Sequence, residues 1–382
     1  MRLKTLPIFL VFLAMGFADA LGPFVGLAKN EFHLSNAVAS LIPFVGFSMF
    51  GLLSVPVGIF QDKHGKKFVL MMGLLVALLG IVNASVGLHS FGRFLLTVLL
   101  LGGGAAILQV AGNPIMRDVS EEGKYARNLS LAQFVKGIGS LSGPMIPVMA
   151  AKFFGTDWKA IFPIYAAALL VTAVAVAGLR VEEKKSDKRA ATLGSCLALL
   201  KNPYVLAMVG AIFLYVGAEV CVSAGIPLLL KERFAMDINR VGLMGTGLFF
   251  IALTIGRFSG GVILNWMSPR RFFVATCGIA VLSLLGLFLP GRTLALCCFF
   301  LAGLSFANIF PLVFSITVES MPEHDNELSG LMVTAIVGGA ILPPLMGVVA
   351  DHSSVRIGFL VPVAAILYVT WNAMVNRKRR KA

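Results

Sequence analysis

The sequence predicts an all-α integral membrane protein whose twelve transmembrane helices form two six-helix repeats. The first observation is composition: 58% of the 382 residues are hydrophobic and only 13% are charged, against about a quarter charged in soluble domains. The second is a mean hydropathy of +0.90 that extends over the whole chain. The third is a single long polar connection, which divides the apolar stretches into two equal sets.

The apolar stretches are each about 18–25 residues long, enough to cross about 30 Å of hydrocarbon as a helix. Helices are required because lipid offers no hydrogen-bond partners to an open backbone. The predicted spans lie near residues 7–28, 38–60, 68–87, 94–116, 129–153, 161–179, 204–230, 241–264, 272–290, 294–318, 330–350 and 357–374.

The distribution of positive charge predicts the orientation. Most of the 32 Lys and Arg residues fall in the two termini and in alternate loops, which places both termini in the cytoplasm. The net charge of +14 is thus a topology signal and does not indicate nucleic-acid binding. The segment 319–327 has four acidic and no basic residues, but acidic residues count little in this rule. We expect a multi-pass protein of the plasma membrane, which in a bacterium is the inner membrane.

The long connection defines the domains. Residues 1–179 are predicted to form an N-terminal six-helix bundle, 180–203 a cytoplasmic linker, and 204–382 a C-terminal bundle with a basic cytoplasmic tail. A short interfacial helix is expected over 193–200. Repeated halves that face one another across a central site are typical of secondary transporters.

A short motif after the second span has a degenerate copy in the second half. Residues 58–68 read GIFQDKHGKKF, and residues 261–271 read GVILNWMSPRR. The pair resembles the loops after helices 2 and 8 of the major facilitator superfamily. This resemblance implies that Gly58, Asp62 and Gly65 serve a conformational gate, with Asp62 as its latch. We expect Lys66 and Lys67 to face the cytoplasmic lipid headgroups.

Five further phrases narrow the resemblance. They read QVAGNP at 109–114, NLSLAQFVK at 128–136, FLYVGAEV at 213–220, IGRF at 255–258 and GGAILPPLMG at 338–347. Together they resemble the fucose–galactose–glucose:proton symporter family along essentially the whole chain. The resemblance implies a proton-coupled importer of neutral monosaccharides that works by alternating access as a monomer. Sodium coupling and uniport stay open.

Only some of the functional residues of that family have the same residue type at the matching position of this chain. In the fucose symporter the coupling acids lie on spans 1 and 4, which match Asp19 and Gln109 here, and a sugar-site Asn on span 5 matches Lys136. This chain therefore keeps one acid, neutralises the other and adds a cation. Those departures leave the sugar and the coupling scheme open.

Charges within the predicted spans are costly in lipid, so they indicate functional groups or structural pairs. Asp19 is interpreted as a coupling acid, with a structural role as the alternative. Glu219 in the seventh span is a candidate replacement for the acid lost at Gln109. Arg257 is interpreted as a structural gate residue that pairs near Asn265.

Sugar hydroxyls need hydrogen-bond donors and acceptors, which Gln109, Asn113, Gln133 and Lys136 can supply. Lys136 has three possible roles: a counter-ion to Asp19, a cation that binds substrate, or a residue with only its aliphatic part buried. The second role gives the alternative function, transport of an anionic sugar acid or another organic anion.

Other function classes lack support in the sequence. No phosphate-binding loop, metal-ligand spacing or cluster of catalytic side chains is present, so we expect no enzyme activity, no cofactor and no metal. The five cysteines lie mostly within spans and are interpreted as small apolar residues. A sugar-sensing receptor on the same scaffold is a third possibility. The expected partners are a small-molecule sugar, a proton and the lipid bilayer.

Overall fold

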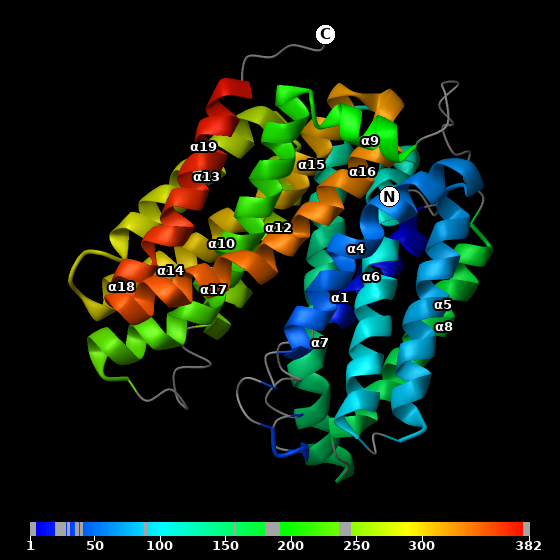
Figure 1. Cartoon of the computed structure of the whole chain (residues 1–382), viewed down its shortest axis with the longest axis horizontal. Coiled ribbons are helices and arrows are strands. Elements are labelled where there is room, and N and C mark those ends of the chain that lie inside the picture. Colours follow the sequence, from blue (N-terminus) through cyan, green and yellow to red (C-terminus); the bar gives the residue numbers. More distant parts are fainter. Residues whose placement is uncertain are drawn as a thin grey trace. The chain divides into compact units, whose positions relative to one another are not determined.

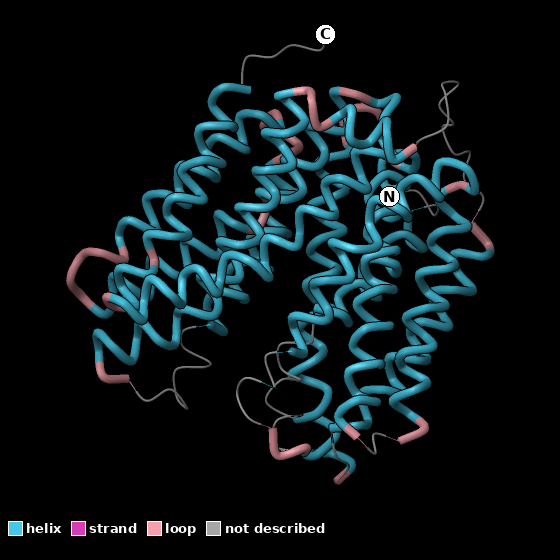
Figure 2. The backbone as a smooth tube through the Cα atoms, viewed as in Figure 1, coloured by secondary structure: helices cyan, strands magenta, loops and turns pink. Residues whose placement is uncertain are grey.

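The structure is a computed structural model of the whole chain. It describes residues 5–19, 28, 31–34, 38, 41–87, 90–155, 158–179, 192–236 and 246–376. Helices account for nearly all of this described part, and no strand occurs in it (Figure 2). The predicted all-α class is therefore confirmed.

In the first half, the helices match the second to sixth predicted spans within a few residues, and the first predicted span is matched as far as Asp19, since residues 20–27 lie outside the described residues. They are α1 (Leu6–Asp19), α4 (Leu41–His64), α5 (Lys66–Ser85), α6 (Phe91–Val119), α7 (Tyr125–Phe154) and α8 (Ile161–Ala177), with the 3-10 turn η2 (Trp158–Ala160) before α8 (Figure 1). The short helix expected in the connection is α9 (Leu193–Leu199). The charged part of that connection, residues 180–191, lies outside the described residues.

The second half contains further long helices and several interrupted ones. They are α10 (Pro203–Phe234), α12 (Thr246–Ile263), α13 (Pro269–Gly286), α14 (Arg292–Phe306), α15 (Ile309–Ser320), α16 (Asp325–Thr334), α17 (Gly338–His352), α18 (Val355–Gly358) and α19 (Leu360–Asn376), with 3-10 turns η3 (Pro322–His324) and η4 (Ala335–Val337). The basic tail from residue 377 onward lies outside the described residues.

Two predicted spans are divided into shorter helices. The tenth is interrupted between α14 and α15. Pro311 has no N–H, so it cannot donate a helical hydrogen bond to the carbonyl of Ala307. The eleventh is divided by η4 into α16 and α17. A 3-10 turn inside a helix often marks a hinge. The division leaves α16 as a separate ten-residue helix.

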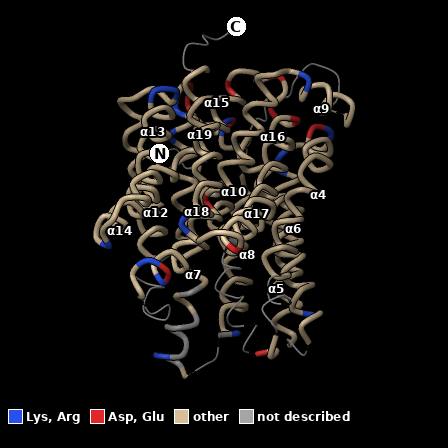
Figure 3. Tube along the Cα trace, turned by 60° about the vertical axis from the view of Figure 1, so that its left-hand side comes forward, with Lys and Arg blue, Asp and Glu red and all other residues tan. Residues whose placement is uncertain are grey.

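The helices have the length and surface of membrane spans. Eight helical segments of the described chain are long and apolar enough to cross a membrane, and three shorter apolar helices accompany them. The 30-residue α7 covers the remaining predicted span. Large apolar side chains such as Leu52, Val174 and Leu282 are exposed, as expected of a lipid-facing surface. Charged residues gather mainly near the helix ends (Figure 3).

The chain divides into two compact units. The first comprises residues Met1–Tyr125, Val135–Leu197 and Glu323–Thr334, so it includes α16 from the second half of the sequence. The second comprises Ala126–Phe134, Ala198–Pro322 and Ala335–Ala382. In the first unit, α6 packs against α1, α4, α5 and α16. In the second unit, α10 packs against α15, α17 and α19, and α12 packs against α14.

Small residues allow α6 to approach its neighbours closely. A Cβ added to Gly104 would lie 2.7 Å from Ala77 of α5, and one added to Gly102 would lie 2.9 Å from the carbonyl oxygen of Gly46 in α4. Such glycines are common where transmembrane helices pack by van der Waals contact. This packing fixes α6, which carries Gln109 and Asn113.

Candidate functional site

The first unit brings Gln109 and Lys136 together. The Lys136 Nζ donates a hydrogen bond of 3.1 Å to the Gln109 Oε1. Both residues are buried: Gln109 is 3% exposed and Lys136 is 8% exposed. The hydrogen bond therefore joins two of the candidate sugar-binding residues, one on α6 and one on α7.

Asp19 is the last described residue of α1, and its side chain lies outside the described part of the structure. The backbone one turn earlier lies beside Lys136. A Cβ added to Gly16 would collide with the Lys136 backbone carbonyl and would lie 2.8 Å from the Cα of Gly139. The turn of α1 that carries Asp19 thus lies directly after the point where α1 contacts α7. Pairing of Asp19 with Lys136 stays a prediction.

Two predicted sugar residues have buried polar atoms without partners. Asn113 is fully buried, and neither its Nδ2 nor its Oδ1 makes a hydrogen bond, although its backbone carbonyl accepts one from the Tyr125 hydroxyl at 2.9 Å. Gln133, one turn before Lys136 on α7, has an unpartnered Nε2 and is 3% exposed. Buried polar groups are normally paired, so unpartnered ones are typical of sites that bind a polar ligand.

In the second unit, Glu219 of α10 lies beside Arg257 of α12. The Glu219 Oε1 is 3.9 Å from an Arg257 terminal nitrogen, and both side chains are mostly buried. The Arg257 Nε is buried without a hydrogen-bond partner. Tyr215, one turn before Glu219 on α10, is buried and lies near the same carboxylate. The membrane-embedded part of this unit thus contains an acid, a cation and a phenol in one cluster.

The position of Arg257 corrects one expectation. We expected Arg257 to pair near Asn265, but the Asn265 carboxamide oxygen accepts a hydrogen bond of 3.2 Å from Arg127 instead. Arg257 lies eight residues earlier, within α12, and points toward Glu219. The opposite charge of Glu219 explains the difference, since an isolated Arg within the membrane is costly.

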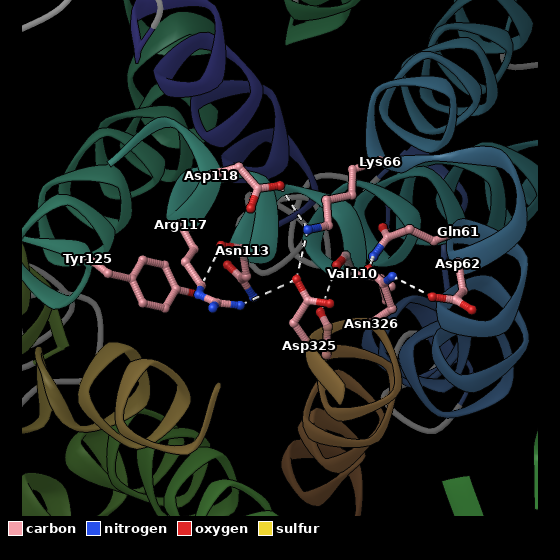
Figure 4. Close-up of polar contacts among 11 residues, drawn as sticks. Gln61, Asp62, Lys66, Val110, Asn113, Arg117, Asp118, Tyr125, Asp325 and Asn326 are labelled. Atoms are coloured by element: carbon pink, nitrogen blue, oxygen red, sulfur yellow. Dashed lines mark hydrogen bonds and ion pairs between the residues drawn. The ribbon is translucent and has the colours of Figure 1, made fainter. Parts of the chain in front are cut away.

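The predicted gate residues meet α16. A Cβ added to Gly58 would lie 2.8 Å from the Asn326 backbone oxygen and 3.2 Å from the Cα of Gly330. The Asn326 side chain donates to the Asp62 carboxylate at 2.9 Å and accepts from Gln61 at 2.6 Å (Figure 4). The glycine pair lets α4 and α16 approach closely, and the amides and carboxylate fix their register.

Gly65 lies between the last residue of α4 and the first residue of α5. Its φ of +88° and ψ of 155° belong to a region that residues with a side chain rarely adopt. This conformation turns the chain sharply between His64 and Lys66. The turn places Lys66 at the first position of α5, where its side chain enters the unit instead of leaving it.

Lys66 was expected to face headgroups, and this expectation is wrong. Its side chain is 3% exposed, and Nζ contacts the Asp118 carboxylate at 2.8 Å and the Asp325 carboxylate at 2.7 Å (Figure 4). Arg117 lies 3.6 Å from the same Asp325 oxygen. A buried cation is tolerated where carboxylates surround it. Lys67 also folds back, and it donates to the Ala177 and Leu179 carbonyls, at the end of α8.

A second contact joins α9 to α16. The Ser195 hydroxyl donates to the Glu327 carboxylate at 2.5 Å, and His324 contacts the other Glu327 oxygen at 2.7 Å. Cys196 beside it is 1% exposed. The acidic segment before the eleventh span is therefore a binding surface for α4, α5, α6 and α9. In the sequence, this acidic segment is visible only as an exception to the distribution of positive charge between the loops.

In the described residues, no group of three or more His, Cys, Asp or Glu side chains could hold a metal ion. The arrangement is therefore one of hydrogen-bonding groups and ion pairs inside apolar helices. Such groups can bind a polar solute and hold or release a proton, with contacts that depend on helix position.

Comparison with known proteins agrees with this chemistry. The Major Facilitator Superfamily profile matches residues 8–336. A glucose/galactose transporter of Brucella abortus is 27% identical over 390 residues, which cover 97% of this chain and 93% of the relative. An L-fucose-proton symporter of Haemophilus influenzae is 21% identical over 410 residues, which cover 94% of this chain and 93% of the relative.

A crystal structure of the transporter FucP in the outward conformation has the same fold. The TM-score is 0.83 at 20% identity, and the alignment covers 99% of this chain and 100% of FucP. These matches confirm the predicted resemblance to fucose–galactose–glucose:proton symporters and the predicted twelve-helix fold, and the relatives are transporters rather than enzymes. The chain belongs to the Major Facilitator Superfamily.

Proposed function

We propose that this protein imports a neutral monosaccharide of the glucose, galactose or fucose type together with a proton. The relatives named as glucose/galactose transporters and as L-fucose-proton symporters support the substrate class and the coupling ion. The observation that carries the proposal for this chain is the buried Gln109–Lys136 pair beside the unpartnered Asn113. These groups offer several donors and acceptors to sugar hydroxyls.

In this proposal, Gln109, Asn113, Gln133 and Lys136 bind the sugar. The hydrogen bond from Lys136 to Gln109 gives the ammonium group a partner within the protein. No relative described above is named as a carrier of organic acids. Neutral sugar transport is therefore preferred over transport of an anionic sugar acid.

We assign proton coupling to Asp19 and Glu219. Because Gln109 cannot titrate, the second carboxylate within the membrane is Glu219, which has Arg257 as its counter-ion. In this proposal, protonation of Glu219 breaks the ion pair and releases Arg257. Charge movement of this kind can bias a transporter between two conformations, provided that the ion pair differs between them.

The gate is assigned to Gly58, Asp62 and Gly65 at the contact with α16. We propose that this contact lies on the cytoplasmic side and closes that side of the binding site. The two sequence bundles, 1–179 and 204–382, then move against each other in a monomer of the inner membrane with cytoplasmic termini. The charge distribution along the sequence supports this orientation.

Uptake into proteoliposomes tests the proposal directly. Labelled glucose, galactose, fucose and glucuronate are compared with and without an inward proton gradient, and an imposed sodium gradient serves as the matched control. We expect accumulation of at least one neutral hexose that requires the proton gradient. Accumulation of glucuronate alone, or a requirement for sodium, would contradict it.

A further inference from the structure

One backbone carbonyl in α6 cannot be satisfied by its own helix. Pro114 lies inside α6 and has no N–H, so the carbonyl of Val110, four residues earlier, loses its helical partner. Val110 is fully buried. Within a membrane, a carbonyl freed by proline is normally satisfied by a side chain of a neighbouring helix.

Ser329 of α16 supplies this hydrogen bond. Its hydroxyl donates to the Val110 carbonyl at 2.6 Å, although the two residues are 219 positions apart (Figure 4 labels Val110). A serine or threonine in a helix usually donates to its own helix, as Ser54, Thr172 and Thr317 do here. Ser329 instead donates to a carbonyl of another helix, and this hydrogen bond joins α16 to the turn of α6 that contains Pro114.

That turn carries two of the proposed sugar residues. Gln109 directly precedes Val110, and Asn113 directly precedes Pro114. Any change in the hydrogen bonding of the turn therefore changes the positions of both side chains. The rest of α16 is held by Lys66, which pairs with Asp325, and by the close approach of Gly330 to Gly58.

We propose that Ser329 is a positioning residue that couples the α16 contact to sugar binding through the Val110 carbonyl. While α16 is packed on α6, the turn has its full set of hydrogen bonds and Gln109 and Asn113 are held in place. When α16 leaves, the carbonyl is unsatisfied and the turn can deform. This inference rests on the proposed function for the identity of the ligand, but the helix contact itself can be tested without sugar.

Cys196 is a natural reporter of the α16 contact. It lies in α9 beside Ser195, which binds Glu327 of α16, and it is 1% exposed. Burial raises the pKa of the Cys196 thiol to about 11, so at pH 7.5 the thiol is protonated and unreactive. Release of α16 exposes the thiol and lowers its pKa toward the ordinary value, which accelerates alkylation.

The experiment is a double-mutant cycle on protein in nanodiscs whose other cysteines, Cys221, Cys277, Cys297 and Cys298, are replaced by alanine. The rate of maleimide labelling at pH 7.5 is measured for Ser329→Ala, Pro114→Ala and the double variant. Pro114→Ala restores an N–H to α6, so the Val110 carbonyl no longer needs Ser329. Ser315→Ala is the matched control, because Ser315 is equally buried and donates to Leu312 of its own helix.

We expect Ser329→Ala to label about five-fold faster than the parent, which is the population shift for loss of one hydrogen bond. In the Pro114→Ala background, the same change should alter the rate less than two-fold, and Ser315→Ala should leave the parent rate unchanged. The Kd for the transported sugar should follow the same pattern, since coupling between the binding free energies of two sites is reciprocal.

Two outcomes overturn the inference: an unchanged labelling rate in Ser329→Ala, or an equal acceleration with and without Pro114. The second would mean that the hydroxyl acts independently of the Val110 carbonyl. A labelling cycle that behaves as expected supports the inference about the helix contact even if none of the four sugars is transported. In that case only the proposed substrate class fails.

Discussion

Lys66 and Asp325, 259 residues apart in the sequence, form an ion pair of 2.7 Å in which both side chains are almost completely buried. Asp118 completes the pair on the other side of the ammonium at 2.8 Å. This relationship fixes α16 to the beginning of α5 and the end of α6. A contact that combines one cation with two buried carboxylates is strong when complete and unstable when one member is removed.

We therefore predict that Lys66→Met destabilises the protein. The change leaves two carboxylates buried close together, at a cost of about 3–5 kcal/mol in the free energy of unfolding. The melting temperature in detergent should fall, and sugar uptake should fall with it. Lys67→Met is the matched control, because Lys67 contacts the Ala177 and Leu179 carbonyls and is less buried. An equal loss in both variants would contradict a special role for Lys66.

A triple variant separates charge from packing. Lys66→Met combined with Asp118→Asn and Asp325→Asn removes all three charges together. We expect it to recover most of the melting temperature lost in Lys66→Met, because no unpaired carboxylate remains buried and Arg117, which loses Asp325 as its partner, is partly exposed. If the triple variant is less stable than Lys66→Met, the loss comes from packing at this site.

The close approach of α4 and α16 predicts the effect of Gly58→Ala. The added methyl group would lie 2.8 Å from a backbone oxygen of Asn326, and backbone atoms cannot move aside cheaply. We expect α16 to be displaced and the initial uptake rate to fall by about ten-fold, a barrier change of about 1.4 kcal/mol. Gly278→Ala in α13 is the control, since no atom lies within 4 Å of a Cβ there. Normal uptake in Gly58→Ala would contradict the proposed gate.

The Glu219–Arg257 pair predicts a separation of coupling from binding. Glu219→Gln removes the titratable group but keeps a hydrogen-bonding side chain of similar size. Sugar counterflow, which needs no proton movement, should continue, whereas accumulation driven by a proton gradient should fall at least about ten-fold. Glu232→Gln, on the same helix but exposed, should behave like the parent. Undiminished accumulation in Glu219→Gln would exclude Glu219 from coupling.

Lys136 distinguishes the substrate classes. Lys136→Asn removes the positive charge and leaves a shorter amide side chain. For a neutral hexose, we expect the uptake rate to stay within about ten-fold of the parent, because loss of one hydrogen bond costs about 0.5–1.5 kcal/mol. Complete loss of uptake would instead indicate that the ammonium group holds an anionic substrate.

Much of the fold could be predicted from the sequence because lipid restricts the possible structures. A helix of about 20 apolar residues leaves a clear pattern, so most of the predicted spans and described helices agree within a few residues. Gln109 and Lys136 were each predicted as site residues on consecutive spans, but the hydrogen bond between them was not predicted. Local hydrophobicity is sufficient to place the spans.

Long-range pairs could not be predicted in the same way. The two carboxylates that bury Lys66 lie 52 and 259 residues away, so the sequence around Lys66 resembles an ordinary basic loop. Asn326 likewise has no local feature that indicates its contact with Asp62. The one available signal was the acidic segment 319–327, which broke the charge pattern without showing what it binds.

Helix interruptions were also missed. The tenth span is largely apolar, and the effect of Pro311 on Ala307 is a backbone effect that hydropathy does not show. The Val110 carbonyl is a similar case, because the sequence shows Pro114 but does not show that Ser329 satisfies the freed carbonyl.

The central claim is that sugar and proton cross the membrane together. The most direct measurement is the pH of a weakly buffered medium around de-energised vesicles that contain the protein, after addition of glucose, galactose or fucose. Cotransport predicts an immediate alkalinisation with the transported sugar, and none with Glu219→Gln although that variant still exchanges sugar. Sugar entry by the parent protein without any change in external pH would contradict it.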